Sequence, residues 1–169
     1  NLVSRLAGIK KIYQYPLFEK KRQHITGAAK KLIKDNLGID VNENPEIQIS
    51  ENLIRETSDK FNIKEDEINV LLAIGGSGPT KRIPSKTFLE FMKKIKNMEK
   101  CRFFLATGKD EDEQKILNEI LDTEFKDQCV ALDNHSIYET LPIIKNCNIA
   151  ICNDTGFSHL ALSLIHISE

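Results

Sequence analysis

From Ile68 onward the chain alternates short apolar runs with amphipathic segments, and this alternation constrains its fold more than any other feature. The apolar runs have the length of buried strands and lie at residues 68–74, 102–106, 129–132 and 148–152. The segments between them have helical spacing, as at Phe88, Phe91, Met92 and Ile95. A repeated strand–helix order predicts a parallel sheet with right-handed crossovers. We therefore expect an α/β, Rossmann-like parallel sheet.

The part of the chain before this alternation predicts two helices and a linker. His24 to Leu37 places apolar residues on one face and is followed by Gly38, a residue that often ends helices. Asp40 to Glu46 is rich in Asn and Glu and contains a proline, which indicates a linker. Ser50 is suited to cap a second helix.

The segment Cys152 to Ala161, CNDTGFSHLA, places polar side chains where the last strand turns into a helix. Backbone N–H groups at a helix start favour an anion, and a glycine lets a ligand approach closely. Asp154 can accept from a ligand hydroxyl or cap the helix, Thr155 can donate to a phosphate, and His159 lies about one turn further. The alternative is that residues 153–156 form only a turn and a helix cap.

A glycine-rich loop, Gly75 to Gly78, leaves the first predicted strand and continues into Lys81-Arg82-Ile83-Pro84. Its backbone N–H groups and the mobile charge of Lys81 suit a phosphate. The loop is not a Walker A motif, because Thr80 precedes the lysine in place of glycine and Arg82 follows it in place of Ser or Thr. Nor is it G-x-G-x-x-G, because Lys81 stands where the third glycine should be.

Together the two motifs resemble glycosyltransferase family 9, the ADP-heptose:lipopolysaccharide heptosyltransferases, over most of the chain. The resemblance depends on Asp154-Thr155-Gly156-Phe157-Ser158-His159, which an Ala- and Leu-rich helix follows, and on the loop that ends in Lys81-Arg82-Ile83-Pro84. It implies that the sheet is the C-terminal half of a GT-B glycosyltransferase fold. In that fold the two loops hold a nucleotide-sugar.

The resemblance also implies a donor-binding role for individual residues. Near the phosphates it places Gly76, Ser77 and Lys81. Near the diphosphate and the sugar it places Asp154, Thr155, Gly156 and His159. An acidic residue after the next strand binds the ribose in the family, and Glu111 and Asp112 are both candidates. The alternative is that the acids at 110–113 only complement the helix dipole.

The same resemblance predicts how the chain is organised. We expect residues 1–45 to be the tail of an N-terminal domain with the interdomain linker, and residues 46–169 to be the nucleotide-sugar-binding domain, truncated at its end. The family's catalytic base is an aspartate near the start of the N-terminal domain, so the catalytic residue is expected outside this chain and the fragment alone is expected to be inactive. The family's loop often begins with His-Pro, where this chain has Ile74-Gly75, and this leaves the loop geometry open.

No metal or cofactor is expected. The four cysteines form no C-x-x-C pair and the four histidines no H-E-x-x-H motif. The enzyme is therefore predicted to be metal-independent, with ADP-heptose as its donor substrate. The sequence has no secretory signal and no apolar run of spanning length, so we expect a cytoplasmic protein, at or near the inner face of the cytoplasmic membrane.

The positive charge in the first third of the chain indicates which kinds of partner the protein could bind. Residues 1–34 hold nine lysines and arginines against Glu19. These bases either form solvated helix faces or attract an anionic membrane surface or lipid-linked acceptor. Nucleic acid is not expected, because the formal net charge of the whole chain is −1.

The predicted activity is transfer of heptose from ADP-heptose to the lipopolysaccharide inner core with inversion, this chain being the donor-binding part. Lys81, the glycine loop and the helix start at Gly156 would stabilise the departing diphosphate. Two alternatives are a GT-B glycosyltransferase that uses another nucleotide-sugar and a non-catalytic nucleotide-binding module.

Overall fold

The computed structural model describes residues 6–13, 25–41, 46–76, 78 and 82–165, and the chain divides into two compact units, Asn1–Pro45 and Glu46–Glu169. The first unit contains helix α2 (Ile25–Leu37). The second contains α3 (Glu51–Phe61), β1 (Ile68–Ala73), α4 (Ser85–Lys96), β2 (Cys101–Ala106), α5 (Glu111–Leu121), a 3₁₀ helix η2 (Lys126–Gln128), β3 (Cys129–Ala131), α6 (Ile137–Lys145), β4 (Ile149–Cys152) and α7 (Gly156–Leu164).

Helix α2 of the first unit ends where the sequence predicts. Gly38 follows its last residue with φ +69°, a left-handed conformation that glycine adopts without strain. The N–H of Gly38 donates to the carbonyl oxygen of Lys34 at 2.9 Å. This bond satisfies a carbonyl that the end of the helix would otherwise leave unpaired.

The second unit is built on a four-stranded sheet of order β3-β2-β1-β4, in which all pairs are parallel. The chain runs from β1 outward through β2 to β3 and then returns past β1 to form β4. The order therefore reverses between β1 and β4. In open sheets of this kind the loops at the carboxyl ends of the two strands that flank the reversal, here β1 and β4, separate and leave a crevice.

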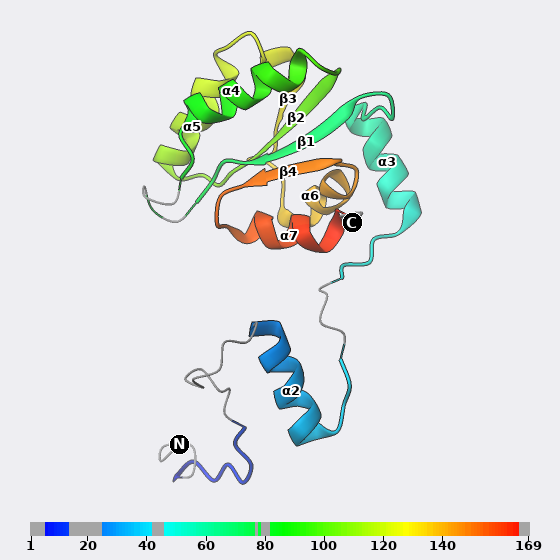
Figure 1. Cartoon of the computed structure of the whole chain (residues 1–169), viewed down its shortest axis with the longest axis vertical. Helices are drawn as coiled ribbons and strands as arrows, with labels where there is room; N and C mark the ends of the chain where they lie inside the picture. Colours follow the sequence, from blue (N-terminus) through cyan, green and yellow to red (C-terminus); the bar gives the residue numbers. More distant parts are fainter. Residues whose placement is uncertain (1–5, 14–24, 42–45, 77, 79–81, 166–169) are drawn as a thin grey trace. The chain divides into compact units, whose positions relative to one another are not determined.

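Helices cover both faces of the sheet, as Figure 1 shows: α4 and α5 lie on one face, and α6 and α7 on the other. Strand β1 contributes to both cores, since Val70 and Leu72 pack with the first layer and Leu71 and Ala73 with the second. A strand that is buried on both faces needs a continuous apolar run. This explains the apolar residues that follow Asn69 in β1, and the parallel sheet confirms the predicted Rossmann-like fold.

Side-chain caps fix the first residue of several helices. Ser50 Oγ accepts from Leu53 N at 3.4 Å, as predicted, and Asp110 Oδ1 accepts from Asp112 N at 3.2 Å. Ser136 and Glu139 form a reciprocal capping box at the start of α6. The hydrogen bonds from Ser136 lower the pKa of Glu139.

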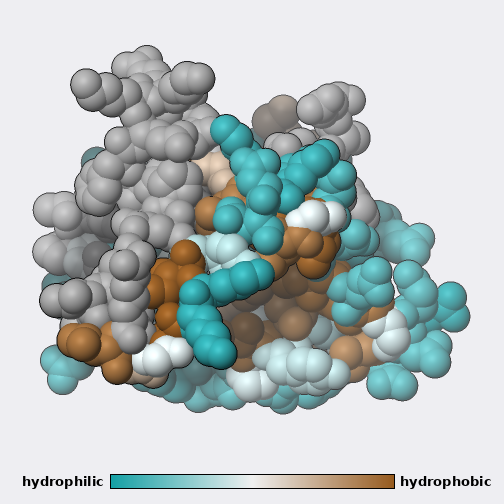
Figure 2. All heavy atoms as spheres, turned by 90° about the horizontal axis from the view of Figure 1, so that it is seen from below, coloured by the Kyte–Doolittle hydropathy of each residue, from teal (hydrophilic) through white to brown (hydrophobic). Residues whose placement is uncertain are grey.

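Some apolar side chains remain exposed, among them Leu6, Ile25 and Tyr138. Figure 2 shows one face of the molecule, on which hydrophobic and hydrophilic residues are interspersed. Within the described ranges no helix is long and apolar enough to cross a membrane.

Candidate functional site

A pocket of about 580 Å³ lies at the carboxyl edge of the sheet, where the strand order reverses. It is formed by the loops after β1, β2 and β4 and by the start of α7. Its lining residues are Gly75, Gly76, Thr107, Gly108, Glu113, Asp154, Thr155, Gly156, Phe157 and His159. The reversal of strand order therefore brings together two motifs that are about 80 residues apart in the sequence.

The structure places the predicted donor-binding residues in three groups. Five line the pocket: Gly76, Asp154, Thr155, Gly156 and His159. Ser77 and Lys81 lie outside the described residues. Glu111 and Asp112, the two candidates for the ribose, do not line the pocket.

Glu113 is the acidic side chain of α5 that lies in the pocket. Its Oε1 accepts from Gly76 N at 2.7 Å, and its Oε2 accepts from Gly108 N at 2.7 Å and from Thr107 Oγ1 at 3.2 Å. One carboxylate thus joins the loop after β1 to the loop after β2. The Asp110-x-x-Glu113 spacing, which is typical of a capping box, could have singled out Glu113 in the sequence. In a capping box Glu113 would accept from the N–H of the N-cap residue Asp110, but here it accepts from the N–H of Gly108, two residues earlier.

Asp112 has a different partner, Arg82. The guanidinium donates from Nη1 to Asp112 Oδ2 at 2.9 Å and from Nη2 to Asp110 Oδ1 at 3.2 Å, and Nε donates to the carbonyl oxygen of Gly76 at 2.8 Å. The Arg82 side chain is only 11% exposed. Arg82 therefore holds the glycine loop against the first turn of α5, and both aspartates serve that contact.

Thr155 occupies the N-cap position of α7, yet its side chain makes no capping hydrogen bond. Its Oγ1 is buried and has no hydrogen-bond partner in the part of the chain that the structure describes. Buried hydroxyls are nearly always paired, so an unpaired one that lines a pocket suits a ligand acceptor. The partial positive charge of the α7 start favours an anion at the same place. Because Thr155 is the N-cap residue, Asp154 does not have that position.

No group of three or more potential metal ligands occurs among the residues that the structure describes. The four cysteines are free, and two are buried. Burial raises the pKa of Cys129 to about 12 and also raises the pKa of the other three thiols.

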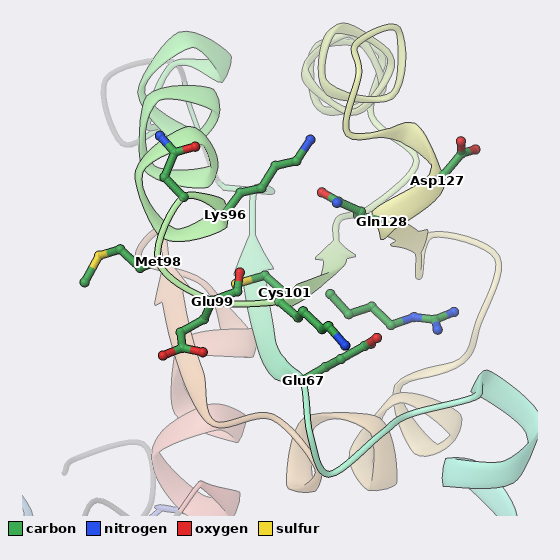
Figure 3. Close-up of a pocket in the computed structure, with 10 residues that line it drawn as sticks. Glu67, Lys96, Met98, Glu99, Cys101, Asp127 and Gln128 are labelled. Atoms are coloured by element: carbon green, nitrogen blue, oxygen red, sulfur yellow. The ribbon is translucent and has the colours of Figure 1, made fainter.

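A second pocket, of about 600 Å³, lies at the opposite edge of the sheet. Figure 3 shows side chains around it from the end of α4, the start of β2 and η2, among them Lys96, Cys101 and Gln128. Its charged lining balances three acids against three bases, namely Glu67, Glu99, Asp127, Lys96, Lys100 and Arg102. The C-terminal end of α4 is adjacent, and its dipole disfavours anions. This pocket is therefore a poor phosphate site.

The fold and the site define a class of protein: a Rossmann-like α/β domain of the kind that forms half of a GT-B glycosyltransferase. Similar solved structures include E. coli ADP-heptose lps heptosyltransferase II, at 25% identity and TM-score 0.59 over 71% of this chain and 37% of that one. The glycosyl transferase family 9 protein from Veillonella parvula DSM 2008 matches 86% of this chain and 42% of its own, with TM-score 0.69 and 17% identity. E. coli heptosyltransferase WaaC with ADP-2-deoxy-2-fluoro heptose matches 85% of this chain and 43% of its own, with TM-score 0.60 and 19% identity.

The chain belongs to glycosyltransferase family 9 (heptosyltransferase), because the model of that family matches residues 8–166. This confirms the resemblance and the fold class predicted from the sequence. Comparison with curated proteins gave no match. The chain spans about two fifths of the length of the solved structures that it resembles.

Proposed function

We propose that this chain is the donor-binding part of a glycosyltransferase that moves heptose from ADP-heptose to the lipopolysaccharide inner core. The observation that carries the proposal is the buried hydroxyl of Thr155, which has no hydrogen-bond partner among the described residues and belongs to a residue that lines the carboxyl-edge pocket. Family membership supports it, as do the WaaC structures with ADP and with ADP-2-deoxy-2-fluoro heptose.

In this proposal the diphosphate lies between Gly76 and the start of α7. The Thr155 hydroxyl donates to a phosphate oxygen, and the helix dipole favours the negative charge. Ser77 and Lys81 belong to the same loop and are proposed to contact the phosphates, the lysine adding a full positive charge. As the bond to the sugar breaks, these donors stabilise the charge that develops on the departing diphosphate. The proposed enzyme needs no metal.

For the ribose we propose Glu113 in place of Glu111 and Asp112. A carboxylate has about four acceptor positions. Three are taken by Gly76, Thr107 and Gly108, which leaves about one on Oε1 for a ribose hydroxyl. Asp112 is committed to Arg82, and its carboxylate does not line the pocket.

Asp154 and His159 line the same pocket and are proposed to contact the diphosphate and the sugar. Inversion by direct displacement also requires a base that deprotonates the acceptor hydroxyl. We propose that this base belongs to an N-terminal domain, of which residues 1–45 form the tail and linker. The lipid-linked acceptor and an anionic, cytoplasmic membrane surface would then face the basic residues in this part of the chain.

Calorimetric titration of the 169-residue chain with ADP, in buffer containing EDTA, tests the donor assignment. We expect ADP to bind and to bind more tightly than UDP or GDP. Preference for UDP or GDP would favour a glycosyltransferase with another nucleotide-sugar. The absence of binding by any of the three would overturn the assignment. Transfer assays with the whole enzyme then separate a transferase from a non-catalytic module.

A further inference from the structure

Asn153 lies immediately before Asp154, at the end of β4, and its side chain is bonded to both ends of the glycine loop. The residue is 3% exposed. Its Nδ2 donates to the carbonyl oxygens of Ile74 at 2.9 Å and Gly75 at 3.1 Å, and its Oδ1 accepts from Ile83 N at 2.9 Å. One amide group therefore joins the backbone at Ile74 and Gly75 to the backbone at Ile83.

The backbone of Asn153 is fixed as well. Its N–H donates to the carbonyl oxygen of Ala73 at 3.1 Å, which continues the pairing of β4 with β1. Figure 1 shows these two strands side by side at the reversal of the sheet. The side chain thus ties the glycine loop to the residue from which the Asp154–Gly156 turn begins.

These three bonds are specific for asparagine. Two donors and one acceptor are needed on a short side chain, and the amide supplies them. Aspartate would keep the acceptor but would place an oxygen opposite two carbonyl oxygens. Serine would offer a single donor. Asn153 does not line the pocket, so its contribution cannot be a contact to the ligand.

We propose that Asn153 is a positioning residue for donor binding: it holds the glycine loop and the Asp154–Gly156 turn in the relative position that receives one diphosphate. This inference rests on the proposed function. A loop that is ordered before binding does not lose its conformational freedom on binding, so affinity is higher than for a loop that the ligand must order. Removal of the amide releases the backbone at Gly75 and Ile83 and lowers affinity without removing a ligand contact.

The test compares Asn153→Asp and Asn153→Ala with a matched control, Asn69→Ala. Asn69 is also buried, at 4% exposed, and its Nδ2 donates to the carbonyl oxygens of Lys64 and Glu67 at the opposite end of β1. The dissociation constant for ADP is measured by calorimetry, at a temperature where circular dichroism shows each variant to be folded. Asn153→Ser keeps one donor and replaces any variant that does not fold.

We expect both Asn153 variants to raise the dissociation constant about tenfold or more, the effect of leaving buried hydrogen-bonding groups unpaired. Asn69→Ala should lose stability but bind ADP as the wild type does. Wild-type affinity in the folded Asn153 variants would overturn the inference, and so would an equal loss in Asn69→Ala.

Amide hydrogen exchange separates this inference from the proposed function. If the wild-type chain fails to bind ADP, the donor assignment fails, but the ordering of the loop can still be measured. We expect Asn153→Ala to accelerate exchange at Ile83 and Gly76 while the amides of β2 keep their protection. Unchanged exchange at Ile83 would show that Asn153 does not order the loop.

Discussion

Replacing Glu113 by glutamine tests the link between the glycine loop and the proposed ribose contact. The substitution keeps the shape of the side chain but changes one carboxylate oxygen into an NH₂ group. In the wild type each oxygen accepts from a backbone N–H at 2.7 Å, so the amide nitrogen must face one of the two donors. The favourable choice keeps an oxygen toward Gly108 and Thr107 and turns the NH₂ group toward Gly76.

The magnitude follows from the single bond that is lost. A hydrogen bond to a charged group contributes about 1.5–3 kcal/mol. Gly76 is buried, so its freed N–H is left without a partner, and we expect the unfolding free energy to fall by about 1.5–3 kcal/mol. ADP affinity should fall about tenfold or more, because the loop is released and the ribose acceptor becomes an amide.

Urea unfolding and calorimetric titration measure the two effects. Glu111→Gln is the matched control, because Glu111 is exposed in the same helical turn and does not line the pocket. Asp112→Asn weakens an ion pair whose carboxylate is 74% exposed, so its cost should stay below about 1 kcal/mol. The reasoning is refuted if Glu113→Gln binds ADP normally while Glu111→Gln or Asp112→Asn does not.

Four further substitutions test the proposed donor site. Lys81→Ala should weaken ADP binding by about 1.5–3 kcal/mol with little effect on the melting temperature; a lower melting temperature with normal binding would make Lys81 structural. Asp154→Asn and His159→Ala should each reduce turnover of the full-length enzyme and be less than additive together, whereas full activity in Asp154→Asn would remove the carboxylate from the site. Gly108→Ala should weaken ADP binding, because the added Cβ would lie 2.7 Å from Glu113 Oε2. Calorimetric titration and thermal melting measure affinity and stability separately, and a lower melting temperature with unchanged affinity would contradict this prediction.

The sequence predicts the fold well because local patterns decide it. The apolar run from Val70 to Ala73 in β1 follows from burial on both faces of a parallel sheet, and helix ends follow from short-range chemistry at Gly38 and Ser50. The predicted strand order along the chain also implies that both motif loops lie at the carboxyl edge, and the structure brings them together there.

The site is predicted less completely, because side-chain direction depends on contacts distant in sequence. Four acids stand in a row at 110–113, and only the docking of α5 on the sheet turns Glu113 toward the pocket and Asp112 toward Arg82. Asn153 looks like an ordinary turn residue until β4 is paired with β1, since its three partners lie about 70 to 79 residues earlier. Neither orientation can be deduced from periodicity.

The central claim is that a nucleoside diphosphate binds at the carboxyl edge of this sheet, and backbone amide NMR shifts during an ADP titration test it most directly. We expect the largest shifts at Gly76, Gly108 and Gly156, which line the carboxyl-edge pocket, and no shifts at Met98 and Gln128 in the pocket of the opposite edge. Shifts confined to Met98 and Gln128, or no saturable shifts at Gly76 and Gly156, would contradict the account.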